Sequence, residues 1–270
     1  MSTSATVSSA SVRWKSIAFP PEHGSWGFLL EPILLGLILA PSWGGLAVAV
    51  GVFGAFLARH PLKVAYSDRR KGKRYARTVV AERFALAYSI LAAVGGVLAL
   101  LLAGPEILLP ALLAVPLGLA QFIGYSTNRG RELVPELAGS AALAATATSI
   151  AVAGGTAWDT ALALWAILVA RNIPSILYIR ARLRLDRGKP FAQMPVLLAQ
   201  IAGVLIPIVL VALGVAPVLA VVALAVLAAR AIFGLSPYRR NVRVQIIGVL
   251  EMVYGFGTVL LALIGYTYNL

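Results

Sequence analysis

The chain has 270 residues, of which 60% are hydrophobic and 12% are charged, and it contains no cysteine. A soluble domain is about one quarter charged and under half apolar, so this composition indicates a membrane protein. The lack of cysteine excludes disulfides, thiolate metal sites and cysteine nucleophiles, and two histidines are too few for a histidine-built metal site. The net charge of +13 is typical of basic loops beside anionic lipid headgroups, and we expect no nucleic-acid partner.

Residues 1–18 are rich in Ser, Thr and Ala, and this composition predicts a disordered cytoplasmic tail. The rest of the chain, residues 19–270, is expected to form a single helical transmembrane domain. Apolar runs of about 17 to 25 residues can span a hydrocarbon core as helices, and such runs follow one another here. We therefore predict an all-α polytopic membrane protein with nine spans, over residues 24–40, 43–58, 84–103, 106–125, 133–153, 158–179, 193–213, 216–235 and 244–266.

The basic residues predict how these spans are oriented. All of the 23 Lys and Arg residues except Arg171 and Arg230 fall in the amino-terminal tail or in the linkers that follow even-numbered spans, with their flanks. Cytoplasmic loops of membrane proteins carry an excess of Lys and Arg. The pattern therefore predicts a cytoplasmic amino terminus, an external carboxyl terminus and a multi-pass location in the cell membrane.

The linker between the second and third spans is the most basic part of the chain. Its sequence, RHPLKVAYSDRRKGKRYAR at residues 59–77, carries more positive charge than is needed to orient one hairpin. The surplus suggests contact with anionic lipid headgroups or with an anionic ligand. A solvated loop beside anionic lipid is the alternative interpretation.

Five ionisable residues stand out within the predicted spans, namely Glu31, Glu136, Arg171, Arg230 and Glu251. Each such group costs at least about 2.5 to 3.5 kcal/mol near the bilayer centre, so each needs a partner or a wet cavity. Four of them, all except Arg230, share the cytoplasmic half of the bilayer in the predicted topology. We expect a cavity that faces the cytoplasm, in which Glu31, Glu136 and Glu251 are the candidate catalytic residues. Pairing of the carboxylates with the two arginines, with no ligand, is the alternative.

Helical spacing selects further candidates on the sixth span. Arg171, Ser175, Tyr178 and Arg182 follow one another at i, i+4, i+7 and i+11, which places them on one helix face. This face is predicted to line the cavity. The candidate substrate-binding residues, taken together, are His23, His60, Lys63, Asp68, Arg171, Asn172, Ser175, Tyr178, Arg180 and Arg182.

Three stretches, PPEHGSWGFLLEPILLG, RHPL and ARNIPSILYIRARLR, carry a family resemblance. With them the chain resembles the YwiC-like family of bacterial multispan membrane proteins, over nearly all of residues 19–266. The signature EHGSWG, at Glu22 to Gly27, carries most of this likeness. The resemblance implies a bacterial membrane protein but no particular reaction.

The nine spans and the polar linkers after spans two and six also resemble the UbiA superfamily of intramembrane prenyltransferases, more remotely. Those enzymes hold an isoprenoid diphosphate through Mg²⁺ on two acidic motifs in these linkers. At the first motif, aligned on His60, this chain has Pro61 and Val64 where acids belong, and Asp68 alone matches.

At the second motif Arg180, Arg182 and Arg184 stand where acids are expected, and Asp186 is left. Because a Mg²⁺ site needs several hard oxygen ligands, we expect no metal site, and the sequence identifies no other cofactor. Arginine and lysine can instead grip a phosphate directly.

The sequence thus favours a UbiA-like protein that binds an anionic amphiphile, an isoprenoid or lipid phosphate. The head group would lie on His60, Lys63, Arg171, Arg180 and Arg182, with the tail among the spans. If the protein is an enzyme, the resemblance implies an intramembrane transferase. A small-anion transporter with a carboxylate proton relay and a membrane scaffold or assembly factor are the two alternatives.

Overall fold

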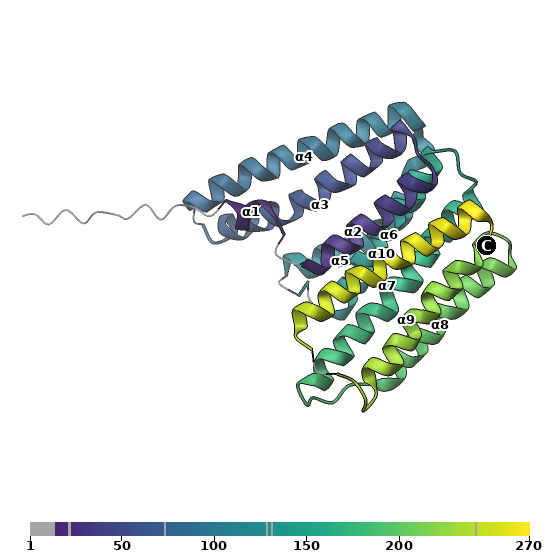
Figure 1. Cartoon of the computed structure of the whole chain (residues 1–270). Helices are drawn as coiled ribbons and strands as arrows, with labels where there is room; N and C mark the ends of the chain where they lie inside the picture. Colours follow the sequence, from purple (N-terminus) through teal and green to yellow (C-terminus); the bar gives the residue numbers. More distant parts are fainter. Residues whose placement is uncertain (1–13, 21–22, 73, 128, 131, 241) are drawn as a thin grey trace, which may run out of the picture.

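The computed structural model describes residues 14–20, 23–72, 74–127, 129–130, 132–240 and 242–270, with the backbone alone at His23. These residues form helices and no strand (Figure 1). In chain order the elements are α1 Lys15–Ala18, α2 His23–Leu39, α3 Trp43–Arg70, α4 Ala76–Ala103, η1 Pro105–Ile107, α5 Leu108–Ser126, α6 Leu133–Ala153, α7 Trp158–Asp186, α8 Gln193–Ala212, α9 Val218–Leu235 and α10 Val244–Tyr268.

Each predicted span falls on one of the helices from α2 to α10, so the all-helical membrane fold is confirmed. Among the described residues, eight helices, counting η1 together with α5, are long and apolar enough to cross a membrane, and Gly24–Leu39 is a shorter apolar helix. The count of nine spans therefore stays a prediction. Of the expected tail, residues 1–13 lie outside the described part, while Ile17 of α1 packs on α3 and α4.

The basic stretch at 59–77, expected to be a linker, is mostly helical, because α3 continues to Arg70 and α4 begins at Ala76. Asp68 holds this hairpin together. Its buried carboxylate accepts hydrogen bonds from Arg77 at 2.6 and 3.0 Å and from the Thr78 hydroxyl at 2.8 Å. Hydropathy identifies only the part of α3 that can lie in lipid. The helix continues past that part into the polar cluster around Asp68.

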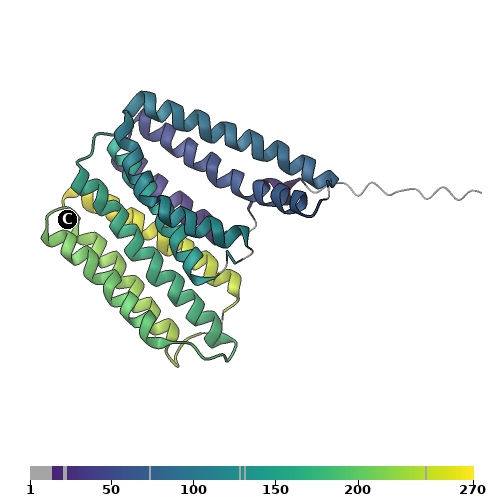
Figure 2. The same cartoon turned by 180° about the vertical axis from the view of Figure 1, so that it is seen from behind.

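The bundle is organised around α6, which packs against α2, α3, α5 and α7. Small residues such as Gly139, Ala144 and Ala147 are buried along α6 and allow these helices to approach closely. The α3–α4 and α8–α9 hairpins form opposite flanks of the molecule, and α10 lies beside α2 and α9 (Figures 1 and 2).

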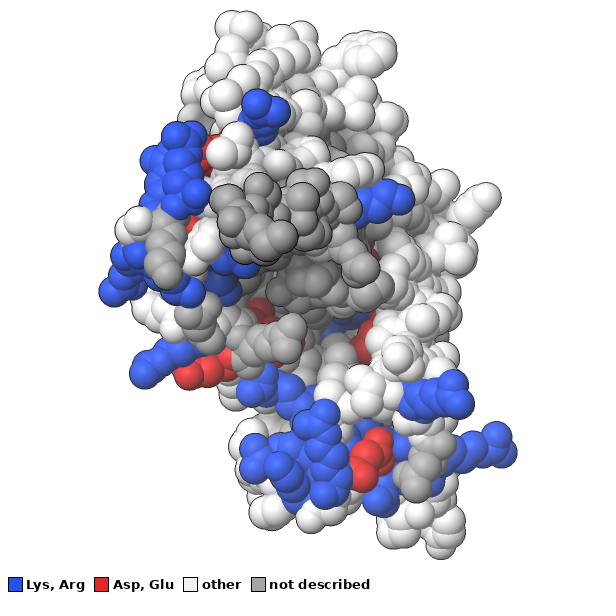
Figure 3. Space-filling view, turned by 90° about the vertical axis from the view of Figure 1, so that its left-hand side faces the viewer, with Lys and Arg blue, Asp and Glu red and all other residues white. Residues whose placement is uncertain are grey.

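Basic side chains gather at one end of the bundle, where α3, α5, α7 and α9 end and α4, α6, α8 and α10 begin (Figure 3). At the other end the connecting residues 40–42, 104, 154–157 and 213–217 contain no Lys or Arg. We call the first the basic end. The predicted orientation places this end in the cytoplasm, and it stays a prediction.

The Asp68 cluster predicts a stability effect for the Asp68→Asn variant. The substitution weakens hydrogen bonds to a buried group, and we expect a loss of about 2 kcal/mol in the free energy of unfolding. The Arg77 side chain is 54% exposed, which limits the contribution of its charge. Circular dichroism during detergent-driven unfolding measures the effect. Glu132→Gln, at an exposed pair with Arg129, is the control and should change stability by less than about 0.5 kcal/mol. Equal stability of the two variants would contradict this role for Asp68.

The orientation predicts the behaviour of reporter fusions expressed in a bacterium. Alkaline phosphatase is active only on the external side of the inner membrane, and green fluorescent protein fluoresces only in the cytoplasm. A fusion after Leu270 should therefore show phosphatase activity and no green fluorescence. A fusion after Arg187, in the linker between α7 and α8, should show the reverse. The same reporter result at both positions would show that α8, α9 and α10 do not each cross the membrane, which would contradict the predicted topology.

Candidate functional site

A cavity of about 750 Å³ lies at the basic end, between α2, α3, α5, α6, α7 and α10. It extends to Gly24, Gly130 and Val244 near the helix ends, and Figure 3 shows a hollow among the charged side chains of this face. Its charged lining residues are Glu31, Arg59, Lys63, Glu136, Arg171, Arg180 and Glu251. Much of the remaining wall is apolar, with Phe28, Leu143, Ile176, Ile179, Leu183, Ile247 and Met252.

The deepest charges form an ion pair between α2 and α7. The Glu31 Oε1 and Arg171 Nη2 atoms lie 3.0 Å apart, and the two side chains are 1% and 3% exposed. Arg171 also donates to the backbone carbonyl of Glu251 at 2.8 Å and to the Asn172 side-chain oxygen at 3.2 Å. Asn172 in turn donates to the carbonyl of Ser140 on α6 at 3.4 Å. One guanidinium thus ties together α2, α7 and α10.

Close packing against this pair depends on Gly255, one helical turn after Glu251 on α10. A Cβ atom at Gly255 would overlap both the Glu31 carboxylate and the Arg171 guanidinium. Glycine therefore allows the backbone of α10 to lie directly against the ion pair. By contrast, a Cβ at Gly257 meets no atom within 4 Å.

A second ion pair joins Glu251 on α10 to Arg230 on α9. The Arg230 guanidinium lies 4.3 Å from the centre of the Tyr178 ring and 4.9 Å from that of Tyr254. It also donates to the Ser175 hydroxyl at 3.4 Å. Arg230 is therefore held between aromatic rings, an arrangement that stabilises a buried cation.

The mouth of the cavity carries a third ion pair and two further cations. Glu136 and Arg180 lie 2.7 Å apart, and each side chain is 39% exposed, so water screens their attraction. The Lys63 ammonium lies 4.0 Å from the centre of the Tyr125 ring, and the Arg59 guanidinium lies 5.4 Å from the same ring. These two cations come from α3 and the ring from α5, so the contact joins two helices that do not follow one another in the chain.

Six of the candidate residues line this one cavity, namely Glu31, Glu136, Glu251, Lys63, Arg171 and Arg180. Six others do not contribute to its lining: His60, Asp68, Asn172, Ser175, Tyr178 and Arg182. The side chain of His23 lies outside the described part of the structure. The convergence expected for the intramembrane charges is therefore present, while the substrate-binding set as a whole stays a prediction.

The polar face of α7 differs most from the expectation. Ser175, Tyr178 and Arg182 face α9 and the segment after it, and Arg182 donates to the backbone carbonyls of Gly234 and Arg240. Helical periodicity identified the face correctly but does not say which neighbour covers it. The cavity instead receives Arg171, Ile176, Ile179, Arg180 and Leu183 from α7.

His60 lies behind the cavity wall and connects α3 to its neighbours. Its Nδ1 atom is 3.4 Å from the Tyr125 hydroxyl, and its Nε2 atom is 3.1 Å from the carbonyl of Ser16 in α1. Sequence reasoning missed Arg59, the preceding residue, and the α5 residues Gln121 and Tyr125. The aromatic and basic residues themselves were visible in the sequence, but their partners come from another helix.

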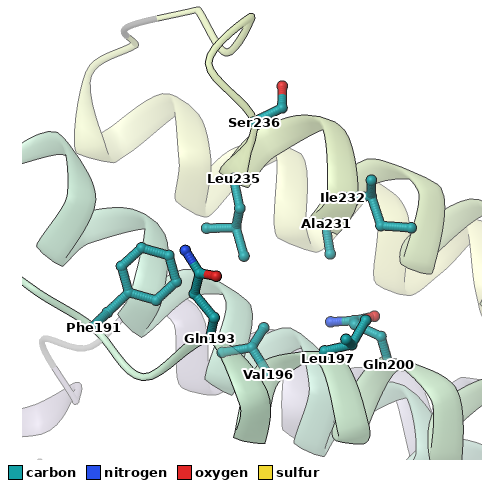
Figure 4. A pocket seen from close by; sticks show the side chains of 9 residues that line it. All are labelled: Phe191, Gln193, Val196, Leu197, Gln200, Ala231, Ile232, Leu235 and Ser236. Carbon is teal, nitrogen blue, oxygen red and sulfur yellow. The ribbon is translucent and has the colours of Figure 1, made fainter.

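A smaller cavity of about 240 Å³ lies between α8 and α9 (Figure 4). Its described lining includes the amides of Gln193 and Gln200 and otherwise mostly apolar side chains such as Phe191, Val196 and Leu235. Gln200 donates to the carbonyl of Pro174 at 3.1 Å, which serves the contact between α7 and α8. The larger cavity is therefore the better candidate for a functional site.

Comparison with known proteins bears on one half of the chain. Residues 19–151 match the family model described as YwiC-like protein, which confirms the resemblance carried by the EHGSWG segment. No curated protein and no solved structure matches the chain. The likeness to UbiA prenyltransferases therefore stays a prediction.

The packing of α10 predicts opposite effects for two neighbouring glycines. Gly255→Ala forces a methyl group into the Glu31–Arg171 pair, and we expect a loss of about 2 to 3 kcal/mol in the free energy of unfolding. Gly257→Ala adds a methyl group in open space and should be neutral or stabilising by up to about 1 kcal/mol. Unfolding curves of the purified variants in detergent measure both effects. If Gly255→Ala were as stable as Gly257→Ala, the close approach of α10 would be wrong.

Proposed function

The chain belongs to the YwiC-like family over residues 19–151, and on this premise we propose that it is a bacterial membrane protein that binds an anionic amphiphile. The ligand class is an isoprenoid or lipid phosphate. The observation that carries the proposal is the convergence of charged side chains from separate helices on one cavity at the basic end. An apolar wall beside those charges suits a molecule with an anionic head and a hydrocarbon tail.

The charge balance of the cavity favours an anion. Four cationic and three acidic side chains line it, and one of the acids, Glu251, is also paired with Arg230 outside the lining. Lysine offers three donors and arginine a planar fork that matches phosphate oxygens. Lys63 lies on the Tyr125 ring and lines the cavity, and in this proposal its ammonium meets the head group at the mouth. The carboxylates beside guanidinium groups make a divalent cation a poor occupant.

The apolar residues of the cavity support the placement of a tail. Ile179 and Leu183 from α7 and Ile247 and Met252 from α10 contribute to the same wall as the charged groups. Burial of apolar surface contributes about 25 cal/mol per Å², so a chain of several methylene groups adds appreciably to affinity. The head would be held by the cations and the tail by this wall.

The half of the bundle that lies away from the basic end favours binding over transport. Beyond the Glu31–Arg171 pair, the helices bury an apolar cluster that includes Leu35, Leu164 and Val259. A small anion crossing the membrane would have to pass this cluster, which offers it no compensating charge. A site that is reached only from the basic end therefore fits the bundle better than a transport path. If the protein is an enzyme, bound substrate would meet the carboxylates of Glu31 and Glu251 in this site.

Paired charge substitutions test the head-group site. We expect the double variant Lys63→Gln, Arg180→Gln to bind phosphatidylglycerol about tenfold more weakly or worse, because each charge-assisted hydrogen bond is worth about 1.5 to 3 kcal/mol. Native mass spectrometry of the purified protein, titrated with phosphatidylglycerol and with phosphatidylcholine of the same chains, measures the affinities.

The matched control is Lys71→Gln, Arg184→Gln, which removes two exposed cations from the same end without touching the cavity lining. It should retain the wild-type preference for phosphatidylglycerol. Equal losses in the two double variants would instead indicate a diffuse basic surface of the kind that a scaffold uses on anionic membranes.

A further inference from the structure

The Glu31 carboxylate is incompletely satisfied by the protein around it. Its side chain is 1% exposed, and neither of its oxygens accepts a hydrogen bond from the described residues. Arg171 lies 3.0 Å away and supplies charge, but the hydrogen bond from its Nη2 atom is directed to the carbonyl of Glu251. The contact between Glu31 and Arg171 is therefore electrostatic and leaves the acceptor capacity of the carboxylate unused.

Glu251 also has a carboxylate oxygen that accepts no hydrogen bond from the described residues. Arg230 donates to its Oε1 atom, while its Oε2 atom is buried and accepts no hydrogen bond within the described part of the chain. Both carboxylates line the large cavity, Glu31 from α2 and Glu251 from α10. The cavity wall therefore presents at least two acceptor atoms to which no described residue donates a hydrogen bond.

Such acceptors carry a free-energy cost when they are buried. A buried polar group without a hydrogen bond costs about 1 to 3 kcal/mol, and more when it is charged. An ionised carboxylate can only accept, so the group that completes it must be a donor. A donor on a molecule in the cavity removes this cost on binding, and the site then discriminates against a molecule that lacks one.

The backbone around Glu31 leaves room for such a donor. Gly27, one turn before Glu31 on α2, also lines the cavity, and a Cβ atom there would come within 3.1 Å of the Glu31 Oε1 atom. Gly24 lines the cavity as well, and a Cβ atom there would meet nothing within 4 Å. Small residues thus keep side chains away from the space beside the carboxylate.

We infer that the anionic head group also presents hydrogen-bond donors, hydroxyl or ammonium, which Glu31 and Glu251 accept. This inference rests on the proposed function and narrows its ligand class. The cations at the mouth bind the phosphate, and the deeper carboxylates bind the polar substituent attached to it. A phosphate esterified with a polyol or an amino alcohol has this chemistry, whereas an unsubstituted isoprenoid phosphate offers its hydroxyl groups on phosphorus alone.

Lipids that differ in donors but not in charge or chains test the inference on the unaltered protein. Phosphatidylglycerol and phosphatidylmethanol each carry one negative charge, but only the first has hydroxyl donors on its head group. Phosphatidylethanolamine and phosphatidylcholine differ in the same way at an ammonium group. Because a hydrogen bond to a charged group is worth about 1.5 to 3 kcal/mol, we expect a preference of about tenfold or more for a donor-bearing lipid in native mass spectrometry.

The outcomes separate the inference from the proposed function. A preference for phosphatidylglycerol over phosphatidylmethanol supports a hydroxyl donor, and one for phosphatidylethanolamine over phosphatidylcholine supports an ammonium donor. If neither preference exists but both anionic lipids bind better than phosphatidylcholine, the inference is overturned and the proposed function stands. If the anionic lipids bind no better than phosphatidylcholine, the proposed function fails and the inference, which rests on it, fails with it, whatever the preference between phosphatidylethanolamine and phosphatidylcholine.

A substitution assigns the preference to the carboxylate. Glu31→Gln keeps the size of the side chain but replaces a charged acceptor by a neutral one, and it should lower the donor preference by about fivefold. Glu132→Gln, at an exposed position outside the cavity lining, is the control and should leave the preference unchanged. A folded Glu31→Gln variant with the full wild-type preference would overturn the role of Glu31. The lipid comparison on the unaltered protein decides the inference even where this variant does not fold.

Discussion

The buried contact between Glu31 and Arg171 is the interaction around which the rest of the bundle is arranged. It joins α2 to α7, and Arg171 extends it to α10 through the carbonyl of Glu251. Removing one partner of a buried ion pair leaves an uncompensated charge and costs about 3 to 5 kcal/mol. The three helices must therefore stay in register, and Gly255 makes the required approach possible. The pair also marks a boundary, with an apolar cluster on one side and the charged cavity on the other.

The three ion pairs of this region are graded by depth. Glu136 and Arg180 at the mouth are each 39% exposed, Arg230 and Glu251 are about one-tenth exposed, and Glu31 and Arg171 are almost fully buried. Electrostatic interactions strengthen as water is excluded, so the outer pair can exchange partners easily and the inner pair is fixed. An incoming anion would meet adaptable charges first and preorganised ones later. This order suits a site that attracts ligands from the basic end and orients them inside.

Hydropathy and charge in the sequence predicted the helices and the shared depth of the buried charges, because both follow from one-dimensional spacing. Which helix packs against a given helix face does not follow from spacing along the chain. The polar stripe of α7 was recognised, yet Ser175, Tyr178 and Arg182 pack toward α9 rather than into the cavity. Asp68 was read against an acidic motif, yet its carboxylate holds the α3–α4 hairpin through Arg77 and Thr78, partners on the next helix. Arg59 escaped notice because it follows the apolar run of α3, while Tyr125, whose ring it faces, lies on α5.

The accessibility of single cysteines tests the central claim, a water-accessible cavity at the basic end, most directly. The chain has no cysteine of its own, so each introduced thiol can be followed without background. Met252 lies on the cavity wall, and Leu164 lies in the buried apolar cluster. With a membrane-impermeant thiol reagent applied to the basic end, the account predicts rapid modification at Met252→Cys, slowed by added phosphatidylglycerol, and none at Leu164→Cys. Equal resistance of the two thiols to modification would contradict it.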